Sequence, residues 1–335
     1  MRLTSVAVAL IAAAACSTPS TPDDPCAATP GTGIRTGSSA DLTIWVVHPR
    51  STDGCITQRL DSHFVFRAPA VTPVGRLFVF LPGTTAIAQY YQLIVAEAAR
   101  AGYHAVGISY PNDNAVGVLC ASQPATCYGD ARLEILTGQA TSSVVAVDRA
   151  NCIENRIVKL LRFMRTTEPA GDWGQFLLGD TAVVWSKVAV AGHSQGGGHT
   201  LFIAQRYAVW RATAYSSAGD FLAGSAAVAP WVLQPYATPA TRLFGFISNA
   251  DELVSPVPTL AAWSAIGMAG AAVDVDVTTP PFGATQRFVT TAAPANPLVT
   301  VSPNHNVVAV DVNTPKVGGT TTPVFAGVWR ALSFP

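Results

Sequence analysis

Residues 187–198 read Lys-Val-Ala-Val-Ala-Gly-His-Ser-Gln-Gly-Gly-Gly. The apolar start of this stretch predicts a strand at 187–191, and the pattern from Gln195 to Arg206 predicts a helix. Ser194 therefore lies in the turn between the expected strand and the expected helix, with glycines at 192 and 196 on either side. Such a turn holds a serine in a strained backbone conformation that exposes its hydroxyl. Glycine is needed on both sides, because a side chain at either flanking position would collide with a neighbouring segment of the backbone. The alternative interpretation is a glycine-rich turn that only permits tight packing.

The sequence on both sides of this turn alternates between strand and helix patterns. We expect strands at 42–48, 63–67, 77–81, 104–109, 187–191, 212–216, 242–248 and 287–291, the first two forming an antiparallel pair. Helices are expected at 89–101, within 142–164, at 195–206 and at 324–332. This alternation predicts an α/β fold with a mostly parallel central sheet and helices on both faces. In such sheets ligands bind at the carboxyl ends of the strands.

Two polar loops supply partners for the serine. A serine hydroxyl is a poor nucleophile without a base, and the base needs an orienting acid. Asp251 follows the expected strand at 242–248, and His305 lies in a polar loop after the last strand. We therefore assign Ser194 as nucleophile, Asp251 as acid and His305 as base. Asp251 as a helix N-cap, with Asp220 or Glu252 as the acid, remains the alternative.

An oxyanion formed during acyl transfer needs two donors. One is the backbone N–H of Gln195, directly after the nucleophile. The other is expected in Pro82-Gly83-Thr84-Thr85, after the strand at 77–81. Thr84 is our choice, because Gly83 lets its successor's N–H turn inward. Thr85 is the alternative donor, and an ordinary Pro-Gly turn is the alternative interpretation of this loop.

Candidate substrate-binding residues come from two places. Thr85 and Tyr90 follow the Pro-Gly turn, and Trp231 lies in residues 221–241, a stretch rich in Ala and Pro. This stretch is too short for a full cap domain but long enough for an apolar wall beside a cleft. The same aromatic residues would serve equally well as core or surface filling.

The string at 192–198, the Pro-Gly turn and the order serine, acid, histidine resemble the α/β-hydrolase superfamily from about residue 77 to the end. The chain is similar to extracellular esterases, lipases and cutinase-like polyester hydrolases. The resemblance implies hydrolysis of carboxylic esters through an acyl-enzyme on a Ser-His-Asp triad, without a cofactor. Two departures weigh against a polyester substrate: Thr84 stands where those enzymes place an aromatic residue, and residues 111–185 form a long insert. An acyltransferase or peptidase with the same triad, or a non-catalytic surface lipoprotein with this fold, are the alternatives.

The N-terminus predicts export. Arg2 and the mostly apolar residues 3–15 predict a signal peptide at 1–16, too short to span a bilayer. Cys16 directly after Ala13-Ala14-Ala15 resembles a lipoprotein lipidation site, which would attach the protein to a membrane; ordinary cleavage after Ala-x-Ala is the competitor. Residues 17–40 are expected to be a flexible linker and residues 41–335 one catalytic domain, active as a monomer. The location is then extracellular, periplasmic or outer-membrane-anchored in a bacterium.

Cysteine and charge content narrow the class further. Six cysteines fit an oxidising compartment. Cys120 and Cys127 bracket a short loop and are the preferred disulfide, whereas the sequence does not choose among Cys26, Cys55 and Cys152. The sequence contains no Cys-x-x-Cys pair and no histidine cluster, so a cysteine metal site is the weaker interpretation of these residues. Charged residues make up only 12% and the net charge is zero, so nucleic acid is excluded as a partner.

Overall fold

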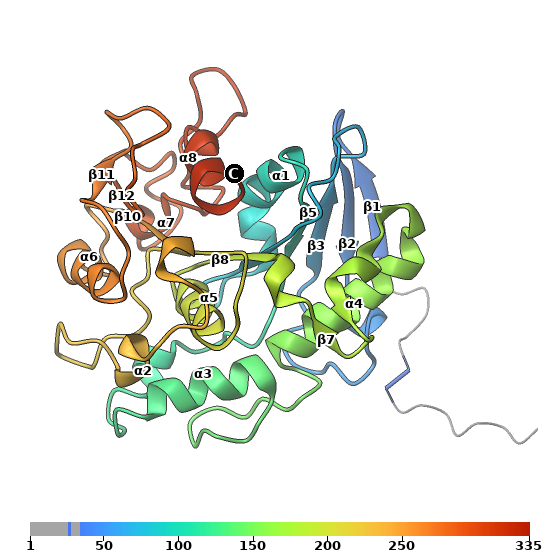
Figure 1. Cartoon of the computed structure of the whole chain (residues 1–335), viewed down its shortest axis with the longest axis horizontal. Helices are drawn as coiled ribbons and strands as arrows, with labels where there is room; N and C mark the ends of the chain where they lie inside the picture. The colour runs from blue at the N-terminus through green and yellow to red at the C-terminus, as the bar shows by residue number, and fades with distance from the viewer. Residues whose placement is uncertain (1–25, 28–33) are drawn as a thin grey trace, which may run out of the picture.

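The computed structural model describes residues 26–27 and 34–335. Ten strands form one mixed sheet in the order β1-β2-β3-β5-β4-β8-β9-β10-β12-β11 (Figure 1). Pairing is antiparallel from β1 to β5 and parallel from β5 to β11. The strands of this sheet are β1 (Ile34–Ser38), β2 (Thr43–Val47), β3 (His63–Arg67), β4 (Leu77–Leu81), β5 (His104–Gly107), β8 (Val188–His193), β9 (Arg211–Tyr215), β10 (Leu243–Ser248), β11 (Val273–Asp274) and β12 (Arg287–Thr290). A separate hairpin pairs β6 (Leu177–Leu178) with β7 (Ala182–Val183).

Helices cover both faces of the sheet, and the central strand β4 shows why. Its side chains alternate: Leu77, Val79 and Leu81 belong to one apolar core, and Phe78 and Phe80 to the other. A strand buried on both faces reads as an unbroken apolar run, and each buried Leu or Phe stabilises the fold by about 1.5–3 kcal/mol. The helices are α1 (Gln92–Arg100), α2 (Val116–Leu119), α3 (Cys127–Thr137), α4 (Ile153–Thr167), α5 (Gln195–Arg206), α6 (Pro256–Ala265), α7 (Pro303–Asn306) and α8 (Ala326–Ser333).

The first core lies under α3, α4, α5 and α6, and the second under α1 and α8. This is the expected α/β arrangement, with a large, mostly parallel sheet between two helical layers. Between β9 and β10 the chain forms only two short 3₁₀ helices, η6 (Pro230–Leu233) and η7 (Ala240–Arg242). That connection leaves the carboxyl edge of the sheet without a domain-sized cover from residues 216–242.

The expected strands and the antiparallel pairing of the first two are confirmed, with shifts of one or two residues at their ends. Residues 34–38, expected to belong to a flexible linker over 17–40, form the edge strand β1 against β2 instead. Residues 17–25 and 28–33 of that expected linker lie outside the described residues. The long helix expected within 142–164 begins only at Ile153. The preceding loop is held instead by the Glu134 carboxylate, which accepts N–H groups from Thr141, Ser142 and Val147 at 2.9–3.0 Å.

Two disulfides tie loops to this frame. The predicted Cys120–Cys127 bridge is confirmed, and Cys26 pairs with Cys55, which leaves Cys152 as a buried thiol. Two such bonds indicate an oxidising environment and hence export. Cys16 and the rest of the expected signal peptide lie outside the described residues. No helix in the described ranges is long and apolar enough to cross a bilayer.

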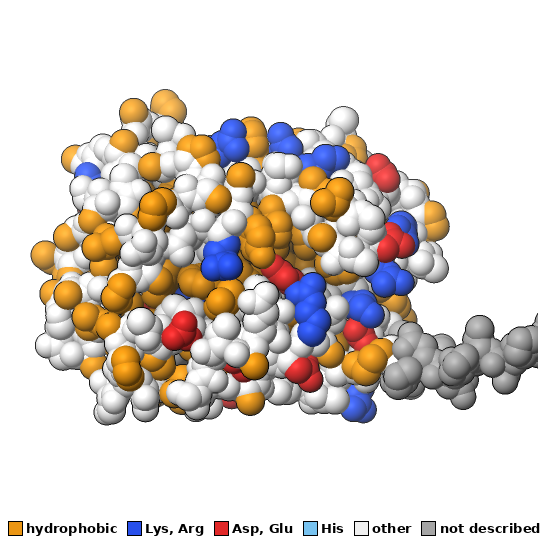
Figure 2. Space-filling view, turned by 60° about the horizontal axis from the view of Figure 1, so that its bottom comes forward, with side chains coloured by type: hydrophobic (Ala, Val, Ile, Leu, Met, Phe, Trp, Pro, Cys, Tyr) orange, Lys and Arg blue, Asp and Glu red, His pale blue; other side chains and the backbone are white. Residues whose placement is uncertain are grey.

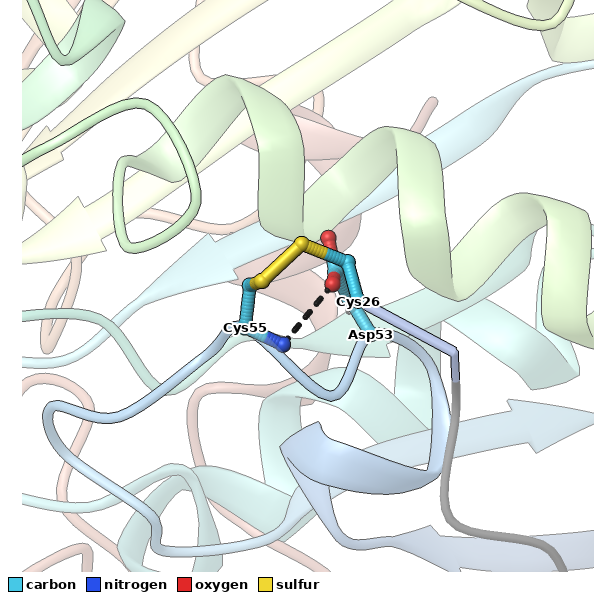
Figure 3. A group of neighbouring side chains, drawn as sticks. All are labelled: Cys26, Asp53 and Cys55. Atoms are coloured by element: carbon cyan, nitrogen blue, oxygen red, sulfur yellow. Dashed lines mark hydrogen bonds between the residues drawn. A yellow bond between two sulfur atoms is a disulfide. The ribbon is translucent and has the colours of Figure 1, made fainter. Parts of the chain in front are cut away.

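Cys26, Cys55 and Asp53 form a cluster of side chains at the start of the described chain (Figure 3). The disulfide uses both sulfur atoms, so neither is a thiolate that could bind a metal. The Asp53 carboxylate instead accepts the Cys55 N–H at 3.0 Å, the Asn155 amide at 3.1 Å and lies 3.0 Å from the Lys159 ammonium. The cluster therefore fastens the N-terminal segment to α4.

Charged side chains are sparse on the surface. On the face shown in Figure 2, hydrophobic and uncharged polar groups cover most of the area, and the few Lys, Arg, Asp and Glu side chains are scattered. This matches the low charge content of the chain.

Candidate active site

The predicted site residues meet at the carboxyl edge of the sheet. Ser194 follows β8, Asp251 follows β10, His305 lies after β12, and Thr84 follows β4. Parallel strands end at a common edge, so residues distant in sequence are brought together there. A cavity of about 750 Å³ opens between these loops, and Ser194, His305, Gln195 and Thr84 all line it.

Ser194 occupies a strained backbone conformation, with φ 54° and ψ −119° between β8 and α5. Its neighbouring glycines are there for steric reasons. A Cβ on Gly192 would overlap the backbone of Gly196, and a Cβ on Gly196 would overlap the carbonyl groups of Leu81 and Pro82. The Ser194 N–H donates to the Tyr215 carbonyl of β9 at 2.9 Å, which holds the turn against the sheet. Strain of this kind costs about 1–3 kcal/mol and is characteristic of functional sites.

His305 and Asp251 form a buried pair. Nδ1 of His305 lies 2.9 Å from both carboxylate oxygens of Asp251. A carboxylate only accepts, so Nδ1 carries the proton and Nε2 keeps a lone pair. Nε2 is buried and makes no hydrogen bond within the described part of the chain. The imidazole is therefore in the tautomer that a general base requires.

The environment of Asp251 keeps it ionised. Burial opposes ionisation, but hydrogen bonds from His305 and from the N–H groups of Leu253 and Val254 outweigh that effect, so its pKa lies below the usual value. The alternative acid Asp220 is occupied elsewhere: Arg132 binds both its oxygens, at 2.5 and 2.7 Å. Within the described chain it is thus Asp251, and not Asp220, that contacts the His305 ring.

Glu252, the other alternative acid, holds the backbone of the histidine loop. Its carboxylate accepts the His305 N–H at 2.7 Å and the Asn304 N–H at 3.0 Å. The His305 carbonyl accepts from the Ser216 hydroxyl at 3.0 Å. Since α7 has only four residues, it cannot order itself, and these contacts fix where its histidine stands.

The loop after β4 presents one candidate oxyanion donor. The Gly83 N–H donates to the Tyr91 hydroxyl, and the Thr85 N–H donates to the Asn112 carbonyl at 2.8 Å. The Thr84 N–H donates to no acceptor among the described residues, which favours it over Thr85. The loop also lies against Ser194, because a Cβ on Gly83 would stand 3.2 Å from the Ser194 Cβ.

The second donor belongs to Gln195, the first residue of α5, whose N–H has no acceptor within the helix. Its side chain ties two loops together. The Gln195 Oε1 accepts the Thr84 hydroxyl at 3.1 Å and the Val116 N–H at 3.0 Å. Thr84 and Gln195, the two candidate oxyanion donors, therefore line the same cavity and are also joined by a hydrogen bond between their side chains.

A buried ion pair contacts the backbone directly after Ser194. Arg132 of α3 binds Asp220 and also donates to the Gln195 carbonyl at 3.2 Å. A Cβ on Gly198 would overlap this guanidinium, which accounts for the third glycine of the string. The sequence offered no signal for this pairing, because Arg132 lies in the insert and its partner is 88 residues away.

The predicted substrate-binding residues divide. Thr85 and Tyr90 line the cavity, and Tyr90 is about half exposed. Trp231 does not line it: the side chain is buried, packs edge-on against Phe202 and donates its indole N–H to Asp220 at 2.8 Å. Trp231 is therefore a core residue that donates a hydrogen bond to a buried carboxylate, and its assignment to substrate binding is wrong.

Comparison with protein-family models and with curated protein sequences finds no match.

Proposed function

We propose that the chain is an exported serine hydrolase with the α/β-hydrolase fold, which cleaves carboxylic esters. The observation that carries the proposal is the arrangement around His305. One ring nitrogen is bound to buried Asp251, the other makes no hydrogen bond among the described residues, and His305 lines the same cavity as Ser194, which stands in its strained turn. The sheet order, with antiparallel strands at one edge followed by parallel strands, also supports this fold.

The reaction follows from these groups. His305 Nε2 takes the proton of the Ser194 hydroxyl as its Oγ bonds to the ester carbonyl carbon. The N–H groups of Gln195 and Thr84 stabilise the resulting oxyanion. Collapse breaks the bond to the alcohol, which leaves with the proton from Nε2. A water molecule then attacks the acyl-enzyme by the same route and releases the acid and Ser194.

The cavity wall favours an uncharged acyl group. Its charged side chains other than the histidines are Arg132 and Asp220, which neutralise each other. The aliphatic members of the wall are Ala86, Ala115, Val116, Val118, Ala218, Leu253, Val254, Val301 and Val310. A neutral ester gains from burial here, whereas a carboxylate or ammonium group would lose hydration without finding a free counter-ion.

We further propose that the chain is anchored or released on the outer side of the bacterial membrane, according to whether Cys16 is lipidated. The two disulfides support an exported location.

The test is hydrolysis of p-nitrophenyl esters from acetate to palmitate by the wild type, Ser194→Ala and Ser264→Ala. Ser264 is an exposed serine of α6 and serves as the matched control. We expect turnover by the wild type and Ser264→Ala, and none above background by Ser194→Ala. Adding an alcohol acceptor or an amide substrate identifies an acyltransferase or peptidase. An active Ser194→Ala variant would remove the basis of the proposal.

A further inference from the structure

A chain of buried hydrogen bonds links the oxyanion loop to the candidate base. The Gly83 N–H lies 3.2 Å from the Tyr91 hydroxyl, which lies 3.1 Å from Nδ1 of His193. Nε2 of His193 lies 2.9 Å from the His305 carbonyl oxygen. Tyr91 and His193 are almost wholly buried, and neither takes part in the reaction as described above.

The direction of every bond in this chain is set by its two ends. A carbonyl oxygen only accepts, so Nε2 of His193 carries the proton and donates to His305. Nδ1 is then an acceptor and receives the Tyr91 O–H, while the Tyr91 oxygen receives the Gly83 N–H. A neutral histidine with its proton on Nε2 satisfies all three bonds at once, whereas the Nδ1–H tautomer would face a carbonyl oxygen with a lone pair.

The surroundings keep His193 neutral. Burial, reinforced by the neighbouring His305, lowers its pKa to about 3. Its ring centroid lies 4.7 Å from that of His305 and 5.7 Å from that of Tyr91. Because the ring is held on both sides, it acts as a spacer of fixed length between the loop after β4 and α7.

We propose that His193, oriented by Tyr91, is a positioning residue that fixes the catalytic histidine relative to the oxyanion loop. The inference rests on the proposed function, since it assigns His305 as base and the Gly83–Thr84 loop as part of the oxyanion site. Both must stand in register with Ser194 in the transition state, and a displacement of about 1 Å can lower a rate by 10²-fold. Loss of the chain should therefore reduce kcat more than it changes KM.

Three variants and one control test this. Tyr91→Phe keeps the ring but leaves the Gly83 N–H and the His193 Nδ1 unpaired. His193→Gln retains an N–H that can reach the His305 carbonyl, whereas His193→Leu retains none. Tyr103→Phe is the control, because Tyr103 is also a buried ring whose hydroxyl donates to a main-chain oxygen, that of Pro335 at 3.3 Å, and it does not line the cavity.

We expect kcat to fall by about 10- to 100-fold in Tyr91→Phe and His193→Leu, with KM within about threefold of the wild type. His193→Gln should recover a large part of the loss, and Tyr103→Phe should keep the wild-type kcat. Equal losses in the Gln and Leu variants would show that His193 only fills space, and an unchanged kcat in Tyr91→Phe would show that the chain positions nothing. Either result overturns the inference while leaving the proposed function in place.

A second measurement does not depend on activity. Nitrogen-15 NMR of selectively labelled histidine reports which ring nitrogen carries the proton. We expect His193 to be neutral and protonated on Nε2 between pH 5 and 9, and the His305 signals to move in Tyr91→Phe. A His193 protonated on Nδ1, or on both nitrogens, would refute the inference even if the wild type hydrolysed no ester and the proposed function had failed.

Discussion

Replacing Asp251 by Asn exchanges one carboxylate oxygen for an amide nitrogen, and the surrounding contacts dictate which one. The N–H groups of Leu253 and Val254 both donate to Oδ1, at 2.9 and 2.8 Å. The Asn oxygen must therefore keep that place, and its NH₂ group takes the place of Oδ2, 2.9 Å from Nδ1 of His305. An NH₂ group only donates, so it favours the imidazole tautomer with its proton on Nε2, the nitrogen that should receive the serine proton. The oxygen at the Oδ1 place also lies 2.9 Å from Nδ1, but it already accepts the Leu253 and Val254 N–H groups, so it is the weaker remaining acceptor for an Nδ1 proton.

The expected consequence is a loss of about 10³- to 10⁴-fold in kcat, or about 4–5 kcal/mol of transition-state stabilisation. KM should change little, because Asp251 does not line the cavity. The assay is p-nitrophenyl ester hydrolysis, with the concentration of folded protein checked by thermal unfolding. An Asp251→Asn variant within tenfold of the wild-type kcat would refute the assignment of Asp251 as the orienting acid.

The remaining predictions concern stability. Gly198→Ala places a methyl group within 2.7 Å of the Arg132 guanidinium, which Asp220 holds in place, so unfolding should cost about 1–3 kcal/mol less; a variant with the wild-type melting temperature would contradict this. Replacing both Cys26 and Cys55 by Ser opens a loop with a sequence separation of 29, so the free energy of unfolding measured in urea should fall by about 3–4 kcal/mol. A double variant as stable as the oxidised wild type would contradict this. Asp311 accepts the N–H groups of Gln92 and Leu93 at the start of α1, and burial raises its pKa to about 7. The folded protein then keeps a proton that the unfolded chain loses above its usual pKa of 3.8, so this residue makes the free energy of unfolding fall as pH rises from about 4 to 7. Asp311→Asn should remove that part of the fall, and an unchanged pH slope between urea titrations at pH 4.5 and 7.5 would contradict it.

Much of the fold could be predicted from local patterns, because its strands are buried on both faces. The run at 77–81 has no polar residue and ends at Pro-Gly, so its bounds match β4. The misses are elements that tertiary contacts create. Strand β1 is largely exposed, with the sequence Ile-Arg-Thr-Gly-Ser, and gains its structure from pairing with β2. Helix α3 is buried on several sides, so its apolar residues do not form one stripe and the helical period is hidden.

The site divides in the same way. The sequence could name Ser194 as a candidate because its turn has a local signature, and Asp251 and His305 because each follows a strand. The contacts that support them join residues that no spacing rule connects. Arg132 reaches Gln195 from the insert, and Glu252 holds the histidine backbone rather than its ring. Trp231 was assigned to the substrate from composition alone, and composition does not tell a cavity wall from a core.

The most direct test of the account is covalent labelling of the nucleophile. The protein expressed without residues 1–25 is treated with a fluorophosphonate probe, and the modified residue is mapped by mass spectrometry in the wild type and in His305→Ala. We expect stoichiometric labelling of Ser194 in the wild type, and a loss of labelling in His305→Ala although that variant remains folded. A folded wild-type protein that is not labelled, or is labelled at another serine, would contradict the claim that Ser194 is an activated nucleophile.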